Sequence, residues 1–368
     1  MASACFNHVK IGGVTCTVGP DFRLSREDPL LRDGDPLQTE RLLKLIGIES
    51  RYVAPLGLTT LDLCEQAARD LLAGAGCGPE TIDAIIFVTQ TPDHPQPCNA
   101  NLLHGRLGCP KSTAAFDINQ GCSGWVYGLY VASCLVEAGG CRRVLLLAGD
   151  TVTQAINPRD RSAAFLFGDA GSATLVEYTE TATESVFSLH SDGRGHDAIS
   201  IPAGGYRAPV PHGGLPEVTD AEGNVRRADE LHMNGVEVLN FTLREEPGAV
   251  RELLRLGGVT TEQVDDFVFH QANRFIVQNL AQRLKLPLSK VPCGTVKRFG
   301  NQSSASIPAV LCHELADKLA IGPRRIVASG FGVGLSWASC LLWLDRLKVC
   351  HLTPYRVIGI KSIRPLSP

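Results

Sequence analysis

The sequence contains an internal repeat whose period is about half the length of the chain, and no other feature limits the possible folds as strongly. Asp83 corresponds to Asp265, and Arg143 corresponds to Arg325, with the same interval between the members of each pair. A repeat this long far exceeds the roughly 20 to 50 residues of a solenoid unit, so it indicates a duplicated domain. The matching segments are residues 75–90 with 257–271, 102–113 with 279–290, and 139–150 with 321–332.

Both copies alternate strongly apolar strands with amphipathic helices. The predicted strands are residues 82–90, 113–119 and 142–150 in the first copy, and 264–270, 290–296 and 324–330 in the second. The predicted helices are residues 60–75 and 123–140, followed by 245–257, 273–285 and 304–320. Strands that are apolar along their whole length are typical of parallel sheets with helices on both faces. Two such halves related by a pseudo-twofold axis give a layered α/β body.

The repeat and the composition divide the chain into parts. We predict one half at residues 1–178 and a second half at residues 179–347. Residues 191–230 are rich in Gly and Pro and are expected to form a surface insertion near the junction of the halves. The tail, residues 348–368, shows no pattern, and its role is unknown.

Composition argues against several classes of protein. The formal net charge of -3 gives no electrostatic basis for binding nucleic acid or an anionic membrane. No apolar run reaches the roughly 18 residues of a membrane span. The thirteen cysteines are an odd number and include no CxxC pair of the kind that builds zinc sites. We therefore expect reduced thiols, no metal site and a cytoplasmic protein.

Cys122 differs from the other cysteines in its surroundings. It follows the predicted strand 113–119 and precedes the predicted helix 123–140, between small neighbours that permit a sharp turn. A helix amino terminus directs free N–H groups at such a sulfur, which lowers the pKa of a thiol from about 8.5 and favours a nucleophilic thiolate. The alternative is that Cys122 is one more small core residue.

Two polar residues of the second half occupy comparable positions. His270 closes the apolar strand 264–270, and Asn301 lies between the predicted strand 290–296 and the next helix. Open α/β sheets bind ligands outside the carboxyl ends of their strands. Each residue alone is more often structural, but the repeat brings these strand ends face to face with Cys122. We therefore predict one cleft that holds Cys122, His270 and Asn301.

The segment Gly330–Gly334 reads GFGVG and superficially resembles a dinucleotide-binding loop. Its spacing is GxGxG, and the apolar strand that follows stands where such a loop needs a helix. A tight turn whose backbone N–H groups approach a bound oxygen is the better interpretation. With the N–H of Cys122 this turn could form an oxyanion hole.

Taken together, these blocks resemble β-ketoacyl-ACP synthase III and its relatives. The matching segments are Gly121–Gly124, Asp160–Arg161, Phe167–Asp169, His270–Asn273, Gly300–Ser306 and Phe331–Trp337. They follow the family order from about residue 11 to residue 343, which is nearly the whole chain. The resemblance implies an α/β thiolase fold, in which duplicated βαβαβ halves make a five-layered αβαβα arrangement.

The resemblance also implies a reaction. Cys122 would take an acyl group from a thioester, and His270 and Asn301 would stabilise the enolate formed when a malonyl thioester loses carbon dioxide. The enolate would attack the acyl group while the N–H groups of Cys122 and Val333 hold its oxyanion. This is a decarboxylative condensation, typical of fatty acid or polyketide biosynthesis. It implies a homodimer and an acyl carrier protein or CoA thioesters as partners, without a further cofactor.

Four positions depart from the family pattern. Members that use CoA primers carry a Trp and an Arg where this chain has Arg41 and Leu45, and Phe275 replaces an Arg. Gln96 stands where a dimer partner commonly lends an apolar residue to the acyl pocket. We hypothesise a primer more polar than acetyl and a specialised pathway. The residues expected to contact substrate are Arg161, Asn273, Gln96 and Phe275.

Other functions are compatible with parts of this pattern. An acyltransferase of the same fold could pass the acyl group to oxygen or nitrogen without condensation, and its catalytic residues would look the same. A non-catalytic partner subunit typically loses the nucleophile, whereas Cys122 is present. A papain-like protease shares the Cys–His–Asn set, but the doubled α/β body and the missing Cys signature argue against it.

Overall fold

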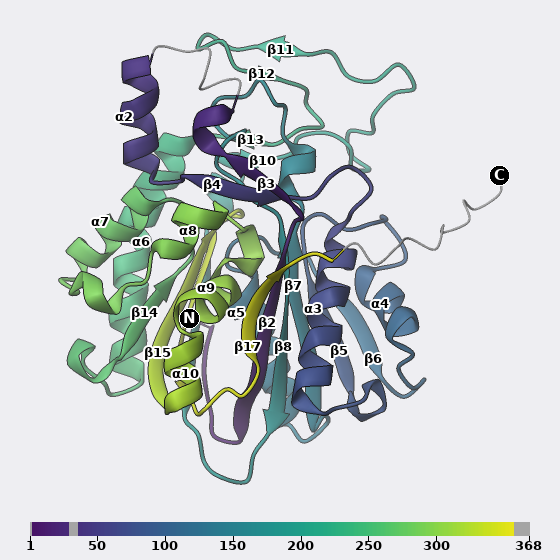
Figure 1. Cartoon of the computed structure of the whole chain (residues 1–368), viewed down its shortest axis with the longest axis vertical. Coiled ribbons are helices and arrows are strands. Elements are labelled where there is room, and N and C mark those ends of the chain that lie inside the picture. Colours follow the sequence, from purple (N-terminus) through teal and green to yellow (C-terminus); the bar gives the residue numbers. More distant parts are fainter. Residues whose placement is uncertain (1, 29–35, 357–368) are drawn as a thin grey trace.

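A computed structural model describes residues 2–28 and 36–356 of the 368-residue chain, and two sheets form its framework (Figure 1). The larger sheet has the order β17 (Cys350–Pro354), β2 (Val9–Val18), β8 (Ala170–Tyr178), β7 (Arg143–Asp150), β5 (Ala84–Val88) and β6 (Ala114–Ile118). The smaller has the order β1 (Ala2–Phe6), β9 (Ser185–Ser191), β16 (Ser336–Leu344), β15 (Arg324–Gly332) and β14 (Asp266–Phe269).

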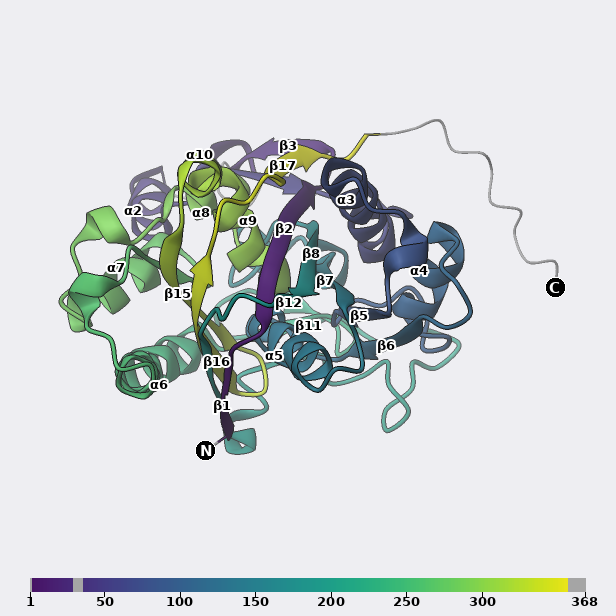
Figure 2. The same ribbon diagram turned by 90° about the horizontal axis from the view of Figure 1, so that it is seen from below.

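Helices and sheets alternate in five layers, as predicted (Figure 2). The inner helices α5 (Gly124–Glu137) and α9 (Ser306–Glu314) share one apolar core with the facing sides of both sheets. The outer helices α3 (Thr60–Ala75) and α4 (Asn99–Leu107) cover the far side of the larger sheet. The far side of the smaller sheet is covered by α6 (Gly235–Leu256) and α7 (Arg274–Arg283). Side chains alternate between faces along each strand, so the central strands bury apolar residues on both sides.

The internal repeat is preserved in the hydrogen-bonded register. Ala84 pairs with Val144 in the first half and Asp266 pairs with Ile326 in the second, so both partners shift by the interval that separates Asp83 from Asp265. The backbone N–H of Arg143 donates to the Asp83 carboxylate at 2.9 Å, and the N–H of Arg325 donates to the Asp265 carboxylate at 2.8 Å. The inner helices start at Gly124 and Ser306, which are separated by the same interval. The halves therefore share these strand pairings and helix starts at one constant interval.

The two ends of the chain cross between the halves. Strand β1 pairs with β9 in the smaller sheet, although it lies at the start of the predicted first half. Strand β17 pairs in parallel with β2 in the larger sheet, although it follows the second half. The predicted division at residues 178 and 347 assigns β1 to the first half and β17 to the tail, although β1 pairs in the sheet of the second half and β17 in the sheet of the first. The tail contains a strand that the sequence pattern did not indicate, and residues 357–368 lie outside the described residues.

The prediction of a strand at residues 290–296 is wrong. This segment contains a short 3₁₀ turn that ends at Lys290, followed by α8 (Gly294–Phe299). Pro292 has no N–H to donate to a strand ladder. The N–H groups of Gly294 and Thr295 donate instead to the Glu314 carboxylate, at 3.0 and 2.7 Å. Within the described residues, the smaller sheet therefore ends at β14, where the larger sheet continues to β6.

The Gly/Pro-rich insertion covers one end of the layered body. It carries β10 (Ile199–Ser200), β11 (Val218–Thr219) and β12 (Val225–Arg226), and β13 (His232–Met233) follows it directly, at the top of Figure 1. The Arg226 guanidinium pairs with the Asp160 carboxylate at 2.7 Å, and the Leu231 N–H donates to the Ala155 carbonyl at 2.7 Å. Among the described residues, no helix is both long and apolar enough to cross a membrane.

Candidate active site

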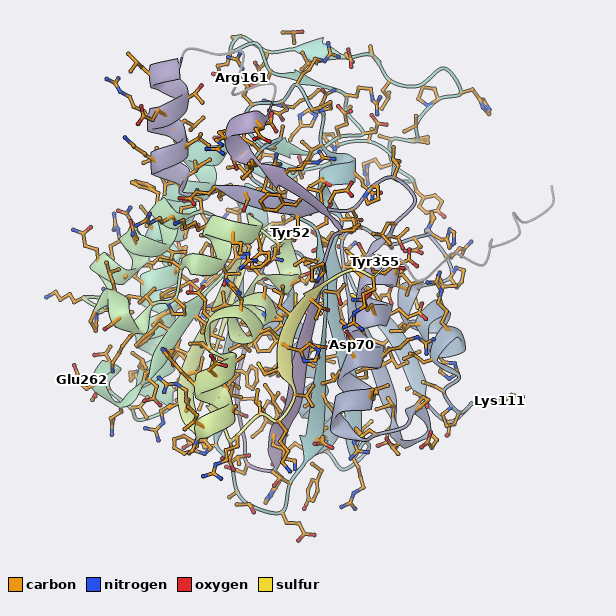
Figure 3. The ribbon with its side chains drawn as sticks, viewed as in Figure 1. Tyr52, Asp70, Lys111, Arg161, Glu262 and Tyr355 are labelled. Carbon is orange, nitrogen blue, oxygen red and sulfur yellow. The ribbon has the colours of Figure 1, made fainter. Side chains whose placement is uncertain are left out.

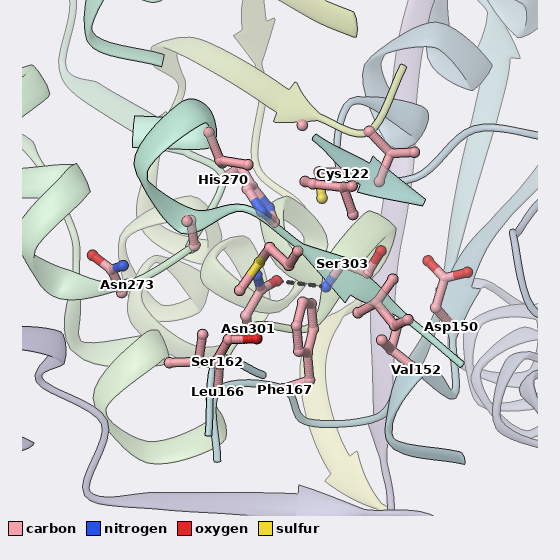
Figure 4. A pocket seen from close by; sticks show the side chains of 18 of the residues that line it. Cys122, Asp150, Val152, Ser162, Leu166, Phe167, His270, Asn273, Asn301 and Ser303 are labelled. Carbon is pink, nitrogen blue, oxygen red and sulfur yellow. Dashed lines mark hydrogen bonds between the residues drawn. The ribbon is translucent and has the colours of Figure 1, made fainter. Parts of the chain in front are cut away.

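A cavity of about 580 Å³ lies beneath the insertion and contains the three predicted catalytic side chains (Figure 4). Cys122 lies between β6 and α5, His270 follows β14 directly, and Asn301 lies between α8 and α9. All three line the cavity, so the structure brings together one residue of the first half and two of the second. A volume of this size suits a small-molecule substrate.

The end of β15 is shaped to fit around Cys122. A Cβ atom at Gly332 would lie 2.7 Å from the Cys122 sulfur, and one at Gly330 would lie 2.7 Å from the Cys122 carbonyl oxygen. Both distances are far below a normal contact, so these two positions require glycine. The close approach leaves Cys122 only 7% exposed, at the amino end of α5.

The expected low pKa of Cys122 is not what this environment produces. Burial and the negative charge of Asp150 raise the pKa of the Cys122 thiol to about 11. The Val333 N–H, the Ser303 hydroxyl and the N–H of Cys122 act in the opposite direction as hydrogen-bond donors, but they do not compensate. The cost of desolvating a thiolate here exceeds the gain from the helix amino terminus. Cys122 is therefore a neutral thiol in the free protein.

His270 is neutral as well. Its ring is 1% exposed, and burial lowers the pKa of the imidazole to about 3. Phe331 packs edge-on against the ring, with the ring centroids 5.4 Å apart. The backbone N–H of His270 donates to the Ser329 carbonyl at 2.8 Å. Nδ1 is buried without a hydrogen-bond partner. A neutral imidazole carries one N–H donor, and a proton on Nε2 gives His270 a donor for a ligand.

The Asn301 amide is held in a defined orientation. Its Oδ1 accepts a hydrogen bond from the Ser303 N–H at 2.9 Å, drawn as a dashed line in Figure 4. Its backbone is fixed by the Leu166 carbonyl, which accepts the Asn301 N–H at 2.9 Å, and by Gly168, whose N–H donates to the Asn301 carbonyl at 2.9 Å. Because Oδ1 is used internally, the amide NH₂ group is left to donate to a ligand.

The turn between β15 and β16 supplies the second backbone donor. Val333 lines the cavity, and its N–H acts on the Cys122 sulfur together with the N–H of Cys122 itself. Two N–H groups that converge beside the nucleophile have the arrangement of an oxyanion hole. The turn joins two antiparallel strands, as the sequence indicated, and is no dinucleotide loop.

The four predicted substrate contacts separate into two pairs. Arg161 is exposed beside the insertion (Figure 3) and lines the cavity, as does Asn273, whose Oδ1 caps α7 by accepting the Ile276 N–H at 2.8 Å. Phe275 packs among apolar side chains of the outer layer and does not line the cavity. Gln96 is exposed and does not line the cavity of this chain either.

Sequence reasoning missed several residues of the site. Asp150, Ser303 and Phe331 line the cavity, although each lies within or beside a segment that the sequence highlighted. Asp150 ends an apolar strand just as His270 does, which was the available signal. The insertion and the helix α2 (Pro36–Ile46) supply apolar lining that no short motif marks. These apolar residues include Leu42, Ile46, Ile199, Leu231 and Met233.

Comparison with known proteins gives the same picture. Residues 116–195 match the family 3-oxoacyl-[acyl-carrier-protein] synthase III, and residues 254–344 match its C-terminal part. A putative 3-oxoacyl-[acyl-carrier-protein] synthase 3 of Campylobacter jejuni is 35% identical over 339 residues, which cover 92% of this chain and 94% of that protein. A β-ketoacyl-[acyl-carrier-protein] synthase III of Roseiflexus castenholzii is 38% identical over 298 residues, with 80% and 87% covered.

Solved structures agree with these relatives. The crystal structure of a 3-oxoacyl-(acyl-carrier protein) synthase from Burkholderia xenovorans matches with a TM-score of 0.90 and 35% identity, covering 96% of this chain and 99% of that one. The priming β-ketosynthase of the R1128 polyketide pathway matches with a TM-score of 0.76 and 27% identity, covering 92% and 98%. The fold and the site define a thiolase-fold enzyme. Within that class, the chain belongs to the 3-oxoacyl-[acyl-carrier-protein] synthase III family.

Proposed function

We propose that this protein is a condensing enzyme of the 3-oxoacyl-ACP synthase III type, which joins an acyl group on Cys122 to a malonyl thioester with loss of carbon dioxide. The observation that carries the proposal is the meeting of a thiol, a neutral imidazole and an oriented amide in one cavity. The proposed reaction needs no cofactor beyond its thioester substrates, because decarboxylation supplies the carbanion.

The first half-reaction transfers the acyl group to sulfur. The Cys122 sulfur attacks the thioester carbonyl, and the N–H groups of Cys122 and Val333 stabilise the oxyanion of the tetrahedral intermediate. The intermediate expels the donor thiolate, which ends with the proton of the Cys122 thiol. A neutral thiol at rest suits this step, because the charge develops only when the substrate carbonyl occupies the oxyanion hole.

The second half-reaction forms the carbon–carbon bond. His270 and Asn301 donate hydrogen bonds to the thioester carbonyl of the malonyl group, so the electron pair left by departing carbon dioxide is held as an enolate. The enolate carbon attacks the acyl carbonyl, and the tetrahedral intermediate expels Cys122 as the thiolate. The low pKa of His270 keeps the imidazole neutral across the physiological range, so its hydrogen-bond capacity does not change with pH.

The primer proposed for the first half-reaction is more polar than acetyl. Gln96 does not support this idea within one chain, but Gln90, Thr91 and Asn119 line the cavity on the side of Cys122. The Gln90 amide donates to the Asn119 side-chain oxygen at 3.1 Å, which leaves further hydrogen-bonding capacity on both amides. Mass spectra of the acyl-enzyme across a panel of primers test the idea. Fast loading of acetyl without preference for hydroxylated or larger acyl groups would contradict it.

The proposed partners are a second copy of the chain and an acyl carrier protein or CoA. Strand β6 is at the edge of the larger sheet, where another copy could extend the sheet. Exposed cations on α2, α7 and α8 would suit the phosphates of CoA or of a carrier-protein arm. These residues are Arg41, Lys44, Arg274, Lys297 and Arg298. A cytoplasmic location is part of the same proposal.

Intact mass spectrometry after incubation with acyl-CoA donors tests the central claim. The wild-type protein should gain the mass of one acyl group, and the Cys122→Ala variant should gain none. The Cys122→Ala variant should still release carbon dioxide from a malonyl thioester, because His270 and Asn301 remain. Acylation of the wild type without release of carbon dioxide would instead favour transfer to an oxygen or nitrogen acceptor. No acylation at all would favour a non-catalytic partner subunit.

A further inference from the structure

Asp150 is a buried carboxylate that none of the steps above uses. It ends β7, is 0% exposed and lines the same cavity as Cys122. Its Oδ1 accepts the Gln90 N–H at 2.7 Å and the Thr89 hydroxyl at 3.2 Å. Its Oδ2 accepts the Ser304 hydroxyl at 2.7 Å and the Ser304 N–H at 3.3 Å. The carboxylate thus joins the first half of the chain to the head of α9 in the second half.

The internal repeat gives the contact between Asp150 and Ser304 an equivalent, which is the approach of Gly332 to Cys122. Ser304 is the repeat equivalent of Cys122, and Gly332 is the repeat equivalent of Asp150, because both pairs have the interval that separates the two copies. At one contact between the copies, Gly332 of the second leaves room for the sulfur of Cys122 of the first, at the start of α5. At the equivalent contact, the space is filled by the Asp150 carboxylate of the first copy, which binds the hydroxyl of Ser304 of the second, near the start of α9. The position equivalent to the nucleophile is therefore a hydroxyl held by a carboxylate.

The bound serine belongs to the turn that presents Asn301. Ser303 has φ 47°, a left-handed conformation that is unfavourable for a residue with a side chain. Its N–H fixes the Asn301 amide, and the next residue, Ser304, is held by Asp150. Figure 4 shows Asp150, Ser303 and Asn301 at the wall of the same cavity. Removal of the Asp150 contact would allow this turn to relax and the Asn301 amide to reorient.

We propose that Asp150 is a positioning residue for the condensation half-reaction, which acts through Ser304 to hold the turn that aims the Asn301 amide at the malonyl thioester. The inference rests on the proposed function, since it assigns a part of that reaction to a further residue. It separates the two half-reactions, because the contact supports Asn301 and does not touch the oxyanion hole.

Asp150 supports condensation through Ser304, but its charge makes Cys122 less reactive. The other titratable side chains that line the cavity with the Cys122 sulfur are Asp150, His270 and the exposed Arg161, and His270 is neutral. The negative charge of Asp150 raises the pKa of the Cys122 thiol, so it disfavours the thiolate. A residue that served only to activate the nucleophile would not carry this charge. The positioning role therefore predicts effects of opposite sign on thiol reactivity and on condensation.

The test compares Asp150→Asn with Ser304→Ala in the full-length protein. Alkylation of Cys122 by iodoacetamide is measured against pH, acylation by intact mass, and condensation by release of carbon dioxide from a malonyl thioester. For Asp150→Asn we expect alkylation at pH 8 to rise several-fold and condensation to fall on the order of 100-fold, mainly in kcat. For Ser304→Ala we expect a similar loss of condensation without the faster alkylation, because the charge of Asp150 remains.

Asp117→Asn is the matched control. Asp117 lies on β6, which β5 separates from β7 in the larger sheet, and it caps α4 by accepting the Asn99 and Ala100 N–H groups, each at 2.8 Å. Its loss should lower stability without separating the half-reactions. An equal loss of acylation and condensation in folded Asp150→Asn, or alkylation no faster than in the wild type, would overturn the proposal. Ser304→Ala alone decides the matter if Asp150→Asn does not fold, since normal condensation in that variant would overturn it.

The failure of the proposed function would look different. In that case the wild-type protein itself would neither acylate Cys122 nor release carbon dioxide from a malonyl thioester, whatever the variants do.

Discussion

The two halves of the chain share strand registers, but the side chains at the ends of their equivalent elements differ in chemistry. The first half places a reactive sulfur at the start of its inner helix, and the second places a restrained hydroxyl there, at Ser304. The second half supplies His270 and Asn301 from segments that have no catalytic counterpart in the first. The comparison shows that the repeated architecture determines where side chains meet, whereas the local sequence determines which half attacks and which half stabilises charge.

The largest effect is expected from a mutation in the second half, because it should abolish one half-reaction and leave the other. His270→Ala should lower the release of carbon dioxide from a malonyl thioester on the order of 1000-fold, because one of two donors to the enolate is lost. Acylation of Cys122, measured by intact mass, should stay within about threefold of the wild type. His313→Ala is the control, since this half-buried histidine lies outside the cavity. Failure of His270→Ala to acylate would mean that the halves do not divide the reaction.

A smaller effect is expected where the second half closes around the nucleophile of the first. Gly332→Ala would put a Cβ atom 2.7 Å from the Cys122 sulfur, so the sulfur or the strand end must move. We expect the rate of acylation to fall on the order of 100-fold, as for other displacements of reacting groups by about 1 Å. Gly322→Ala, whose added Cβ would meet no atom within 4 Å, should leave the rate unchanged. A wild-type rate in Gly332→Ala would show that the close approach has no catalytic consequence.

The smallest effect concerns the outer helices. In the first half α3 buries the neutral Gln66, whereas α6 in the second half buries Glu246, whose Oε1 accepts the Ser329 hydroxyl and whose Oε2 has no partner. Burial raises the pKa of Glu246 to about 8. The folded state therefore keeps a proton that the unfolded state releases at lower pH. Stability is highest below the unfolded-state pKa and falls as the pH rises toward 8.

The measurement is the free energy of unfolding in urea at pH 6 and pH 8.5. The wild-type protein should lose about 2 kcal/mol between these values, and Glu246→Gln should lose much less. Glu245→Gln, next along α6, is the control and should keep the wild-type dependence. Equal pH dependence of the free energy of unfolding in Glu246→Gln and the wild type would show that ionisation of Glu246 does not cause the loss of stability.

Much of this arrangement could be predicted from the sequence, because it depends on local patterns and on the repeat. Asp83 and Asp265 revealed the repeat, and both accept backbone N–H groups from the equivalent neighbouring strand. Cys122, His270 and Asn301 could be placed together since each is near the end of an element in a repeated frame. The helix at residues 60–75 was predicted with its observed bounds, because its apolar period and its capping residues are local.

Other features depend on the assembled structure. The partner of a strand is a long-range property, so the pairing of β1 with β9 and of β17 with β2 left no local signal. The pKa of Cys122 is set mainly by burial, which a helix start in the sequence does not reveal. Phe275 and Gln96 were expected to contact substrate because they correspond to family positions, and their side chains lie outside the cavity of this chain. Asp150 was overlooked because its function depends on a serine in the other half of the chain.

The crossed ends of the chain have a consequence for biosynthesis. Strand β1 is translated well before its partner β9, which starts only at Ser185. Strand β2 is likewise translated long before its neighbour β17, which starts at Cys350. Until these partners have been translated, both early strands present unpaired backbone, which is a hazard for aggregation. The nascent chain therefore has an interval in which chaperone protection matters, and it lasts until β17 can pair with β2.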